Sequence, residues 1–198
     1  MPDKDLHQQL LSMDRRSFMR LLATAAAAYP LSLLADKRAT QATTAELQEP
    51  WKTLDIVMEH LFPAEDDSPG SRDIQAITYM QNMLQAPDVA EAERDFIFNG
   101  VGWLNDLAEK NHSAKFPALN ETQREIVLRT IEQSRAGERW LSLLLTWLIE
   151  ALLSDPVYGG NPNGIGWKWL EHQPGYPTPS PDKMYFKLGQ ITHKRTKA

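Results

Sequence analysis

The residues that could do chemistry gather in a glycine-rich stretch near the C-terminus, from Ser154 to Pro181. It contains Tyr158-Gly159-Gly160-Asn161 and Gly164-Ile165-Gly166-Trp167, and glycine-rich loops before helices can bind phosphate groups. The glycine spacing fits neither of the two common nucleotide-binding motifs, and no strand is expected before it. We therefore predict that the chain binds no nucleotide and no cofactor of its own.

Acid–base and nucleophilic chemistry find little support among the other side chains. The five histidines lie at positions 7, 60, 112, 172 and 193, with no pair at the i, i+4 spacing typical of metal ligands. Glu171 and His172 are adjacent, and adjacent residues of a helix point apart. No serine lies in a G-x-S-x-G motif, and cysteine is absent. We predict no catalytic and no metal-binding residue; a stand-alone periplasmic enzyme using Glu171 and His172 is the alternative.

The glycine-rich stretch combines residues that allow unusual backbone conformations with a large aromatic surface. Its tyrosines and tryptophans alternate with glycines and prolines, and such rings give a large contact area for little lost side-chain freedom. The stretch is either a lid that packs on the chain's own core or a docking surface for another protein, and one lid could do both. The predicted partner interface comprises Tyr158, Gly159, Gly160, Asn161, Gly164, Gly166, Trp167, Trp169 and Tyr176.

The elements that must position this stretch are helices. Apolar residues recur with helical period over residues 51–62, 72–84, 91–110 and 138–153, and a further helix is expected to start at Asn120. No segment alternates with period two. We therefore predict an all-α fold, a single irregular bundle of about five to six helices with a glycine-, proline- and aromatic-rich C-terminal loop region. The helix over 138–153 is nearly apolar all round, which indicates the middle of a bundle or a face covered by another protein.

Two details of these helices lead to specific expectations. Gly100 and Gly102 lie inside the third helix, where each glycine costs about 1 kcal/mol relative to alanine. We expect a close helix–helix approach or a break there, with Trp103 covering the gap. Asn120 followed by Gln123 predicts a capping arrangement at the start of the fourth helix.

Length and composition limit the possible classes of protein. A chain of 198 residues that is 42% hydrophobic and 24% charged is typical of one globular domain. Its net charge of −5 argues against a nucleic-acid partner, and the absence of cysteine excludes disulfides and thiolate metal sites. We predict a signal segment and linker over residues 1–42, a helical domain over 43–181, and a basic tail over 182–198 that we expect to be flexible.

The N-terminal segment has the layout of an export signal. Arg15-Arg16-Ser17-Phe18 precedes an uncharged apolar run from Leu21 to Ala35, and paired arginines before Phe18 look like a twin-arginine signal. The run is shorter than the roughly 20 residues that span a membrane comfortably. We expect the twin-arginine translocase to export the chain to the periplasm, with Arg15, Arg16 and Phe18 as signal residues. Membrane association would occur only through this segment, left uncleaved, or through a partner.

Several short blocks carry a family resemblance. They are Asp155-Pro156, 158–161, 164–167, Pro174-Gly175, Leu61-Phe62-Pro63, Ser68-Pro69-Gly70 and 116–124. Together with the twin-arginine start, these blocks resemble the gluconate 2-dehydrogenase subunit 3 family. The resemblance covers roughly residues 50–180.

This resemblance implies the small subunit of a periplasmic complex. A large FAD-containing subunit of the glucose–methanol–choline type would oxidise a sugar, sugar acid or alcohol, and a multihaem cytochrome c subunit would accept the electrons. The small subunit would carry the export signal and support maturation and assembly, without catalytic residues of its own. A purely structural periplasmic adaptor with no redox partner is a further alternative.

Overall fold

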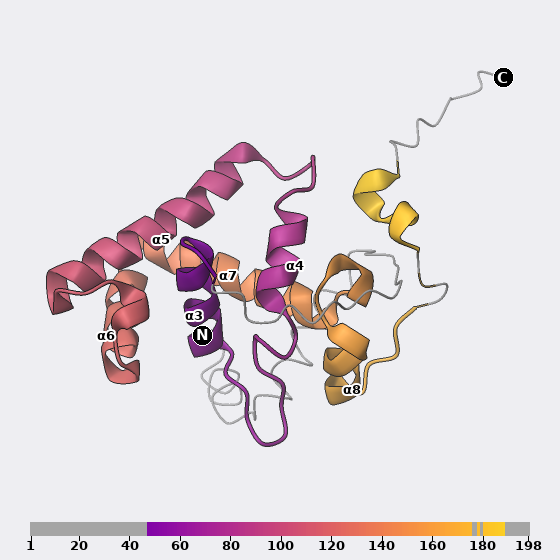
Figure 1. The fold of residues 1–198 in the computed structure, drawn as a ribbon, viewed down its shortest axis with the longest axis horizontal. Helices are drawn as coiled ribbons and strands as arrows, with labels where there is room; N and C mark the ends of the chain where they lie inside the picture. Colours follow the sequence, from indigo (N-terminus) through magenta and orange to yellow (C-terminus); the bar gives the residue numbers. More distant parts are fainter. Residues whose placement is uncertain (1–46, 176–177, 179, 189–198) are drawn as a thin grey trace, which may run out of the picture.

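The computed structural model describes residues 47–175, 178 and 180–188 (Figure 1). The predicted signal residues Arg15, Arg16 and Phe18, and Tyr176 of the predicted interface, lie outside this part of the chain. Among the described residues the backbone forms helices and no strand, apart from one isolated bridge between Glu65 and Ser68. The prediction of an all-α fold is confirmed.

The described domain contains six α-helices. Their bounds are Trp51–Leu61 (α3), Ala76–Met83 (α4), Glu91–His112 (α5), Glu121–Glu132 (α6), Arg135–Leu153 (α7) and Ile165–Leu170 (α8). Short 3-10 turns lie at Phe116–Ala118 (η1), Pro156–Tyr158 (η2), Pro162–Gly164 (η3), Pro181–Lys183 (η4) and Tyr185–Lys187 (η5). The glycine-rich C-terminal region is therefore a series of 3-10 turns around the short helix α8.

Helix α7 is the central element of the bundle. It contacts α3, α4, α5, α6 and α8, and Figure 1 shows it running behind α3 and α4. Trp140, Leu144 and Leu148 are buried along it. The helix starts at Arg135, before the predicted start at 138, because the Ser134 hydroxyl oxygen accepts a hydrogen bond from the N–H of Gly137. Its nearly apolar sequence reflects this central position, although one face stays exposed.

Helix α4 is shorter than its sequence pattern predicts. The apolar period suggests a start at Arg72, but the helix begins at Ala76 because Gln75 has a φ of 52°. That left-handed conformation cannot continue a right-handed helix. The preceding turn buries Ile74 completely, and the carbonyl of Ile74 accepts a hydrogen bond from the N–H of Asn161. This hydrogen bond from the C-terminal stretch therefore helps to fix residues 72–75 as a turn, although the local pattern assigns them to the helix.

The close approach expected at Gly100 is present, but a different tryptophan occupies it. A Cβ atom on Gly100 would lie 2.1 Å from Nε1 of Trp140, whose indole N–H donates to the carbonyl of Ile97 over 2.9 Å. Trp103 is 38% exposed and packs edge-on against Phe96. The expectation that Trp103 covers the gap is wrong, because Trp103 lies on the solvent side of α5.

The start of α6 has the predicted capping box. Oδ1 of Asn120 accepts from the N–H of Gln123 over 3.0 Å, and Oε1 of Gln123 accepts from the N–H of Asn120 over 3.1 Å. These reciprocal bonds satisfy two N–H groups that the helix itself leaves unpaired. The Arg124 side chain then donates to the carbonyl of Pro117, which ties α6 to the preceding turn η1.

Candidate functional site

The glycine-rich stretch forms a cap on the end of α7, which we call the C-terminal cap (residues 154–170). Oδ1 of Asp155 accepts from the N–H of Val157 over 3.0 Å and starts turn η2, where Pro156 sets the backbone angle. Gly159 ends this turn with a φ of 92°, which glycine adopts without strain. The chain then reverses and brings α8 into contact with α7 (Figure 1).

Asn161 holds the C-terminal cap together while it is completely buried. Its Nδ2 donates to the carbonyl of Ser154 over 2.9 Å, and its Oδ1 accepts from the N–H of Gly166 over 2.7 Å. Its backbone N–H donates to Ile74 and its carbonyl accepts from Gly164, both over 2.9 Å. The φ of 48° is one that asparagine tolerates better than most residues. One side chain thus joins the start of the cap, α8 and the turn before α4.

At two glycines of the C-terminal cap, an added Cβ atom would come too close to a neighbouring atom. A Cβ atom on Gly166 would lie 2.2 Å from the carbonyl oxygen of Leu152, and one on Gly159 would lie 2.3 Å from Nδ2 of Asn82. The same Nδ2 donates to the carbonyl of Tyr158 over 3.1 Å. Gly166 is needed because the cap packs closely on the backbone of α7, and Gly159 is needed chiefly for its positive φ.

The aromatic side chains of the C-terminal cap point mainly into the protein. Tyr158 is 7% exposed and Trp169 is 8% exposed. The Trp169 ring meets the ring of Phe62 edge to face, with centroids 6.3 Å apart. Trp167 is half-buried, and its indole N–H donates to the carbonyl of Leu153 over 2.8 Å. These rings therefore stabilise the cap on the bundle.

Most residues of the predicted partner interface lie inside the chain's own fold. The buried ones are Tyr158, Gly160, Asn161, Gly164, Gly166 and Trp169. Gly159 and Trp167 are half-buried, and Tyr176 lies outside the described residues. Of the two interpretations of this stretch, a lid on the chain's own core accounts for these positions. Contact of the same residues with a partner stays a prediction.

The beginning of the predicted basic tail packs against the C-terminal cap. Met184 is 8% exposed, and the N–H of Tyr185 donates to the hydroxyl of Tyr158 over 3.3 Å. The rings of Tyr185 and Phe186 lie 6.1 Å and 6.4 Å from that of Tyr158, measured between centroids. Packing therefore continues past residue 181, where we expected a flexible tail to begin.

Glu171 and His172 mark the end of α8. Both are exposed, and Glu171 has a φ of 55°, which stops the helix. The backbone N–H of His172 donates to the carbonyl of Trp167 over 2.8 Å. Neither residue lines the hollow between α3 and α6 or the groove between α5 and α7. Their positions suit a helix terminus and give no support to an enzyme built on this pair.

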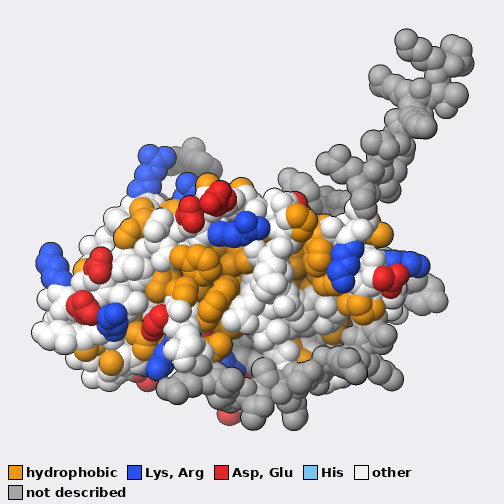
Figure 2. Space-filling view, turned by 45° about the horizontal axis from the view of Figure 1, so that its top comes forward, with side chains coloured by type: hydrophobic (Ala, Val, Ile, Leu, Met, Phe, Trp, Pro, Cys, Tyr) orange, Lys and Arg blue, Asp and Glu red, His pale blue; other side chains and the backbone are white. Residues whose placement is uncertain are grey.

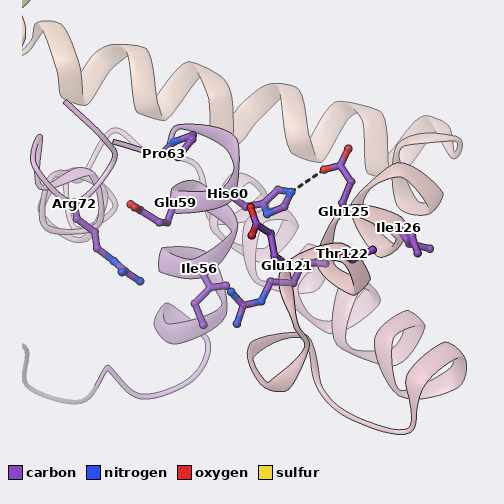
Figure 3. A pocket seen from close by; sticks show the side chains of 10 residues that line it. Ile56, Glu59, His60, Pro63, Arg72, Glu121, Thr122, Glu125 and Ile126 are labelled. Carbon is purple, nitrogen blue, oxygen red and sulfur yellow. Dashed lines mark hydrogen bonds and ion pairs between the residues drawn. The ribbon is translucent and has the colours of Figure 1, made fainter. Parts of the chain in front are cut away.

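A hollow of about 680 Å³ lies between α3 and α6 and is lined largely by charged side chains (Figure 3). In it, Nε2 of His60 lies 2.7 Å from Oε2 of Glu125. The bonds from His60 and Arg129 hold the pKa of the Glu125 carboxyl below its usual value. Two more of its charged groups have partners in the chain, Glu59 with Ser71 and Arg72 with Asp55. These groups already bond within the chain and help to hold α3, α6 and the turn before α4 together, whereas Nε of Arg124, which also lines the hollow, is buried without a hydrogen-bond partner.

Two kinds of feature are absent from the described residues. Among residues 47–175, 178 and 180–188, no group of three His, Asp or Glu side chains is placed to hold a metal ion. Over the same ranges, no helix combines the length and the apolar character needed to cross a membrane. The predictions that this chain holds no metal and no cofactor stay predictions.

A family model decides which group of proteins this chain belongs to. The model described as gluconate 2-dehydrogenase subunit 3 matches residues 48–175, which is more than half of the chain. The chain belongs to the gluconate 2-dehydrogenase subunit 3 family. No curated protein and no solved structure gives a significant match.

The region that matches gluconate 2-dehydrogenase subunit 3 runs from α3 to α8, and its separate sequence blocks meet in space. Phe62 of the first block packs on Trp169 of the C-terminal cap. The carbonyl of Phe62 accepts from the N–H of Ser71 over 2.7 Å, and a Cβ atom on Gly70 would lie 2.4 Å from the backbone nitrogen of Ala64. The blocks that resemble the family therefore make contacts that hold this subunit 3 fold together.

Sequence reasoning gave no role to a half-buried carboxyl of this subunit 3 chain. Glu150 lies on α7, where burial raises the pKa of its carboxyl and the nearby charge of Glu93 raises it further. The Tyr79 hydroxyl donates to Oε2 of Glu150 over 3.4 Å, which lowers the pKa of Glu150 in part, and burial raises the pKa of Tyr79. The sequence signal was a single carboxylate near the end of a helix that is otherwise apolar.

Replacing Glu150 by glutamine is expected to stabilise the protein at neutral pH. A carboxyl whose pKa is raised by folding binds its proton more tightly in the folded chain. Its stabilisation is full below the unfolded pKa of about 4.3 and is lost as the pH rises through the folded pKa. Glutamine stays neutral, so the variant should lack this loss. Urea unfolding between about pH 4 and pH 8 would measure it.

The matched control for this change is Glu138→Gln, because Glu138 is exposed on the same helix. We expect it to leave the pH dependence of the unfolding free energy close to that of the wild type. Equal pH dependence in Glu150→Gln and the wild type would show that burial does not shift this carboxyl.

Proposed function

We propose that this chain is a non-catalytic small subunit of a periplasmic flavin-dependent sugar or sugar-acid dehydrogenase of the gluconate 2-dehydrogenase type. It carries the export signal of the complex and supports maturation and assembly of the FAD-containing catalytic subunit. The observation that carries the proposal is the family match over residues 48–175. The sequence Arg15-Arg16 before the run Leu21–Ala35 supports the export part of it.

The geometry of the described residues supports a binding role over a catalytic one. The polar side-chain atoms of Asn161, in the C-terminal cap, bond within the chain. The closest acid–base pair in the α3–α6 hollow, His60 and Glu125, joins two helices of the fold. Side chains engaged in this way hold the fold in place for a surface that other subunits can recognise.

In this proposal the reactive groups belong to the partners. FAD lies in the large dehydrogenase subunit, and haem c lies in a third, cytochrome subunit that accepts the electrons. The twin-arginine translocase is a further partner, which reads Arg15, Arg16 and Phe18. The complex reaches the periplasm as a folded assembly because its large subunit travels with the signal of this chain.

Replacing Arg15 and Arg16 together by lysine tests the proposal. We expect the dehydrogenase activity of the large subunit to stay in the cytoplasmic fraction, because the translocase reads the paired guanidinium groups of the signal. The measurement is activity with an artificial electron acceptor in separated periplasm and cytoplasm. Arg38→Lys, behind the apolar run, is the matched control and should leave export unchanged. Periplasmic activity in the double variant would refute the escort role.

A further inference from the structure

A groove of about 520 Å³ between α5 and α7 has no role in the proposed function so far. Its lining residues are Ala90, Ala92, Glu93, Phe96, Arg139, Ser142, Leu143 and Thr146. The four positions on α7 are spaced i, i+3, i+4 and i+7, so they form one face of that helix. Figure 2 shows one face of the molecule, with a central apolar area and charged side chains around it.

The groove exposes side chains of the types that dominate binding interfaces. Phe96 is half-buried, with the Arg139 guanidinium 4.9 Å from its ring centroid and the Trp103 ring edge-on at 5.7 Å. Trp103, which packs on Phe96 beside the groove, is 38% exposed. Aromatic and arginine side chains supply most of the binding energy in interfaces, and a groove between two helices fits a third apolar helix.

One end of the groove is acidic. Glu93 lines this end of the groove, and three further carboxylates, Asp88, Glu91 and Asp95, lie within five residues of it in the sequence. The one basic residue among them, Arg94, donates to the carbonyls of Leu84 and Ala86 and is therefore directed at the backbone. Glu93 also lies near enough to Glu150 for its charge to act on that carboxyl. An occupant of this groove should therefore be apolar with basic residues at one end.

We propose that the apolar run Leu21–Ala35 of this same chain binds in the α5–α7 groove, with Arg15, Arg16 and Arg20 at the acidic end. Bound in this way, the signal is withheld from the translocase. The inference rests on the export signal of the proposed function. Residues 1–46 lie outside the described part of the chain, and only their sequence enters the argument.

The connection between run and domain is long enough for this contact. The 15 residues of the run would measure about 22 Å as a helix, shorter than α5 with its 22 residues. The 11 residues from 36 to 46 can extend over about 36 Å, more than the radius of a domain of this size. A tethered segment has an effective concentration of about millimolar, so a weak contact suffices to keep the groove occupied.

A photo-crosslinking side chain at Thr146 tests the proposal in the full-length chain, produced in cytoplasm without the partner subunit. Thr146 is exposed in the groove, and its hydroxyl bonds only to the carbonyl of Ser142 in its own helix. We expect crosslinks within one chain to peptides of residues 15–35. Their yield should be at least about tenfold higher than from the same probe at Lys168, exposed on α8, because only the groove holds the tethered segment.

Two variants show whether the groove causes the crosslink. Leu143→Glu and Ala92→Arg place charge in the groove, and each should lower the crosslink yield about tenfold while circular dichroism stays helical. Equal yields from Thr146 and Lys168, a crosslinked dimer, or a yield that both variants leave unchanged would overturn the proposal. Crosslinking does not need the translocase. Its outcome is therefore independent of the export test, and the groove proposal and the proposed function can fail separately.

Discussion

Replacing Asn161 by alanine is expected to destabilise the domain by about 3–7 kcal/mol. The change leaves the carbonyl of Ser154 and the buried N–H of Gly166 without their partners, at about 1–3 kcal/mol each. It also puts alanine at a φ of 48°, which costs about 1 kcal/mol or more. Typical domains are stable by only about 5–15 kcal/mol, so urea unfolding should show a clear shift.

A neighbouring residue supplies the control for this prediction. Asn163 has a similar φ of 55° but is exposed, so Asn163→Ala should show the backbone cost without the lost buried hydrogen bonds. Asn161→Gly removes the same bonds but tolerates the left-handed conformation, and should be less harmful than Asn161→Ala by about 1 kcal/mol. If Asn161→Ala were no worse than Asn163→Ala, the two side-chain bonds would contribute nothing to stability.

Replacing Gly100 by alanine is expected to destabilise the protein by about 1–3 kcal/mol, although alanine is the better helix former. The new methyl group would lie 2.1 Å from Nε1 of Trp140. Trp140 is completely buried, and its indole N–H donates to the carbonyl of Ile97. The ring must therefore move in a close-packed core, and moving it weakens that bond.

Gly102 in the same helix provides the matched control. A Cβ atom on Gly102 would meet nothing within 4 Å, so Gly102→Ala should stabilise the protein by about 0.5–1 kcal/mol. Thermal unfolding followed by circular dichroism should give opposite shifts in Tm for the two changes. Stabilisation by both would mean that Trp140 does not need the space at Gly100.

Binding of the signal in the α5–α7 groove, as proposed, would act on the half-buried carboxyl of Glu150. Glu150 and Glu93 lie near the acidic end of the α5–α7 groove, where the proposal places the basic residues of the signal. A basic segment bound there would lower the pKa of Glu150 toward its ordinary value, because opposite charges favour the ionised carboxyl. The pH dependence of stability would then differ between chains with and without the signal residues.

The sequence alone determined the helical class and most of the helix bounds. The apolar period of about 3.6 residues identified the helices, and Asn120 with Gln123 marked the start of α6, because these signals act within one turn of the chain. The family blocks were also recognisable from sequence, and the family match over 48–175 confirmed them. Local sequence patterns were enough to predict a structural feature wherever its physical cause lies in neighbouring residues.

The tertiary structure decided which side chains meet. A helical pattern shows which face of a helix is apolar but not which neighbour covers it, so Trp140 and not Trp103 fills the space at Gly100. The late start of α4, after Gln75, and the inward direction of Trp169 depend on contacts between residues far apart in the sequence. Burial of Glu150 arises in the same way, from helices that surround it only in the folded chain. Such contacts depend on how the helices pack, and no local pattern encodes them.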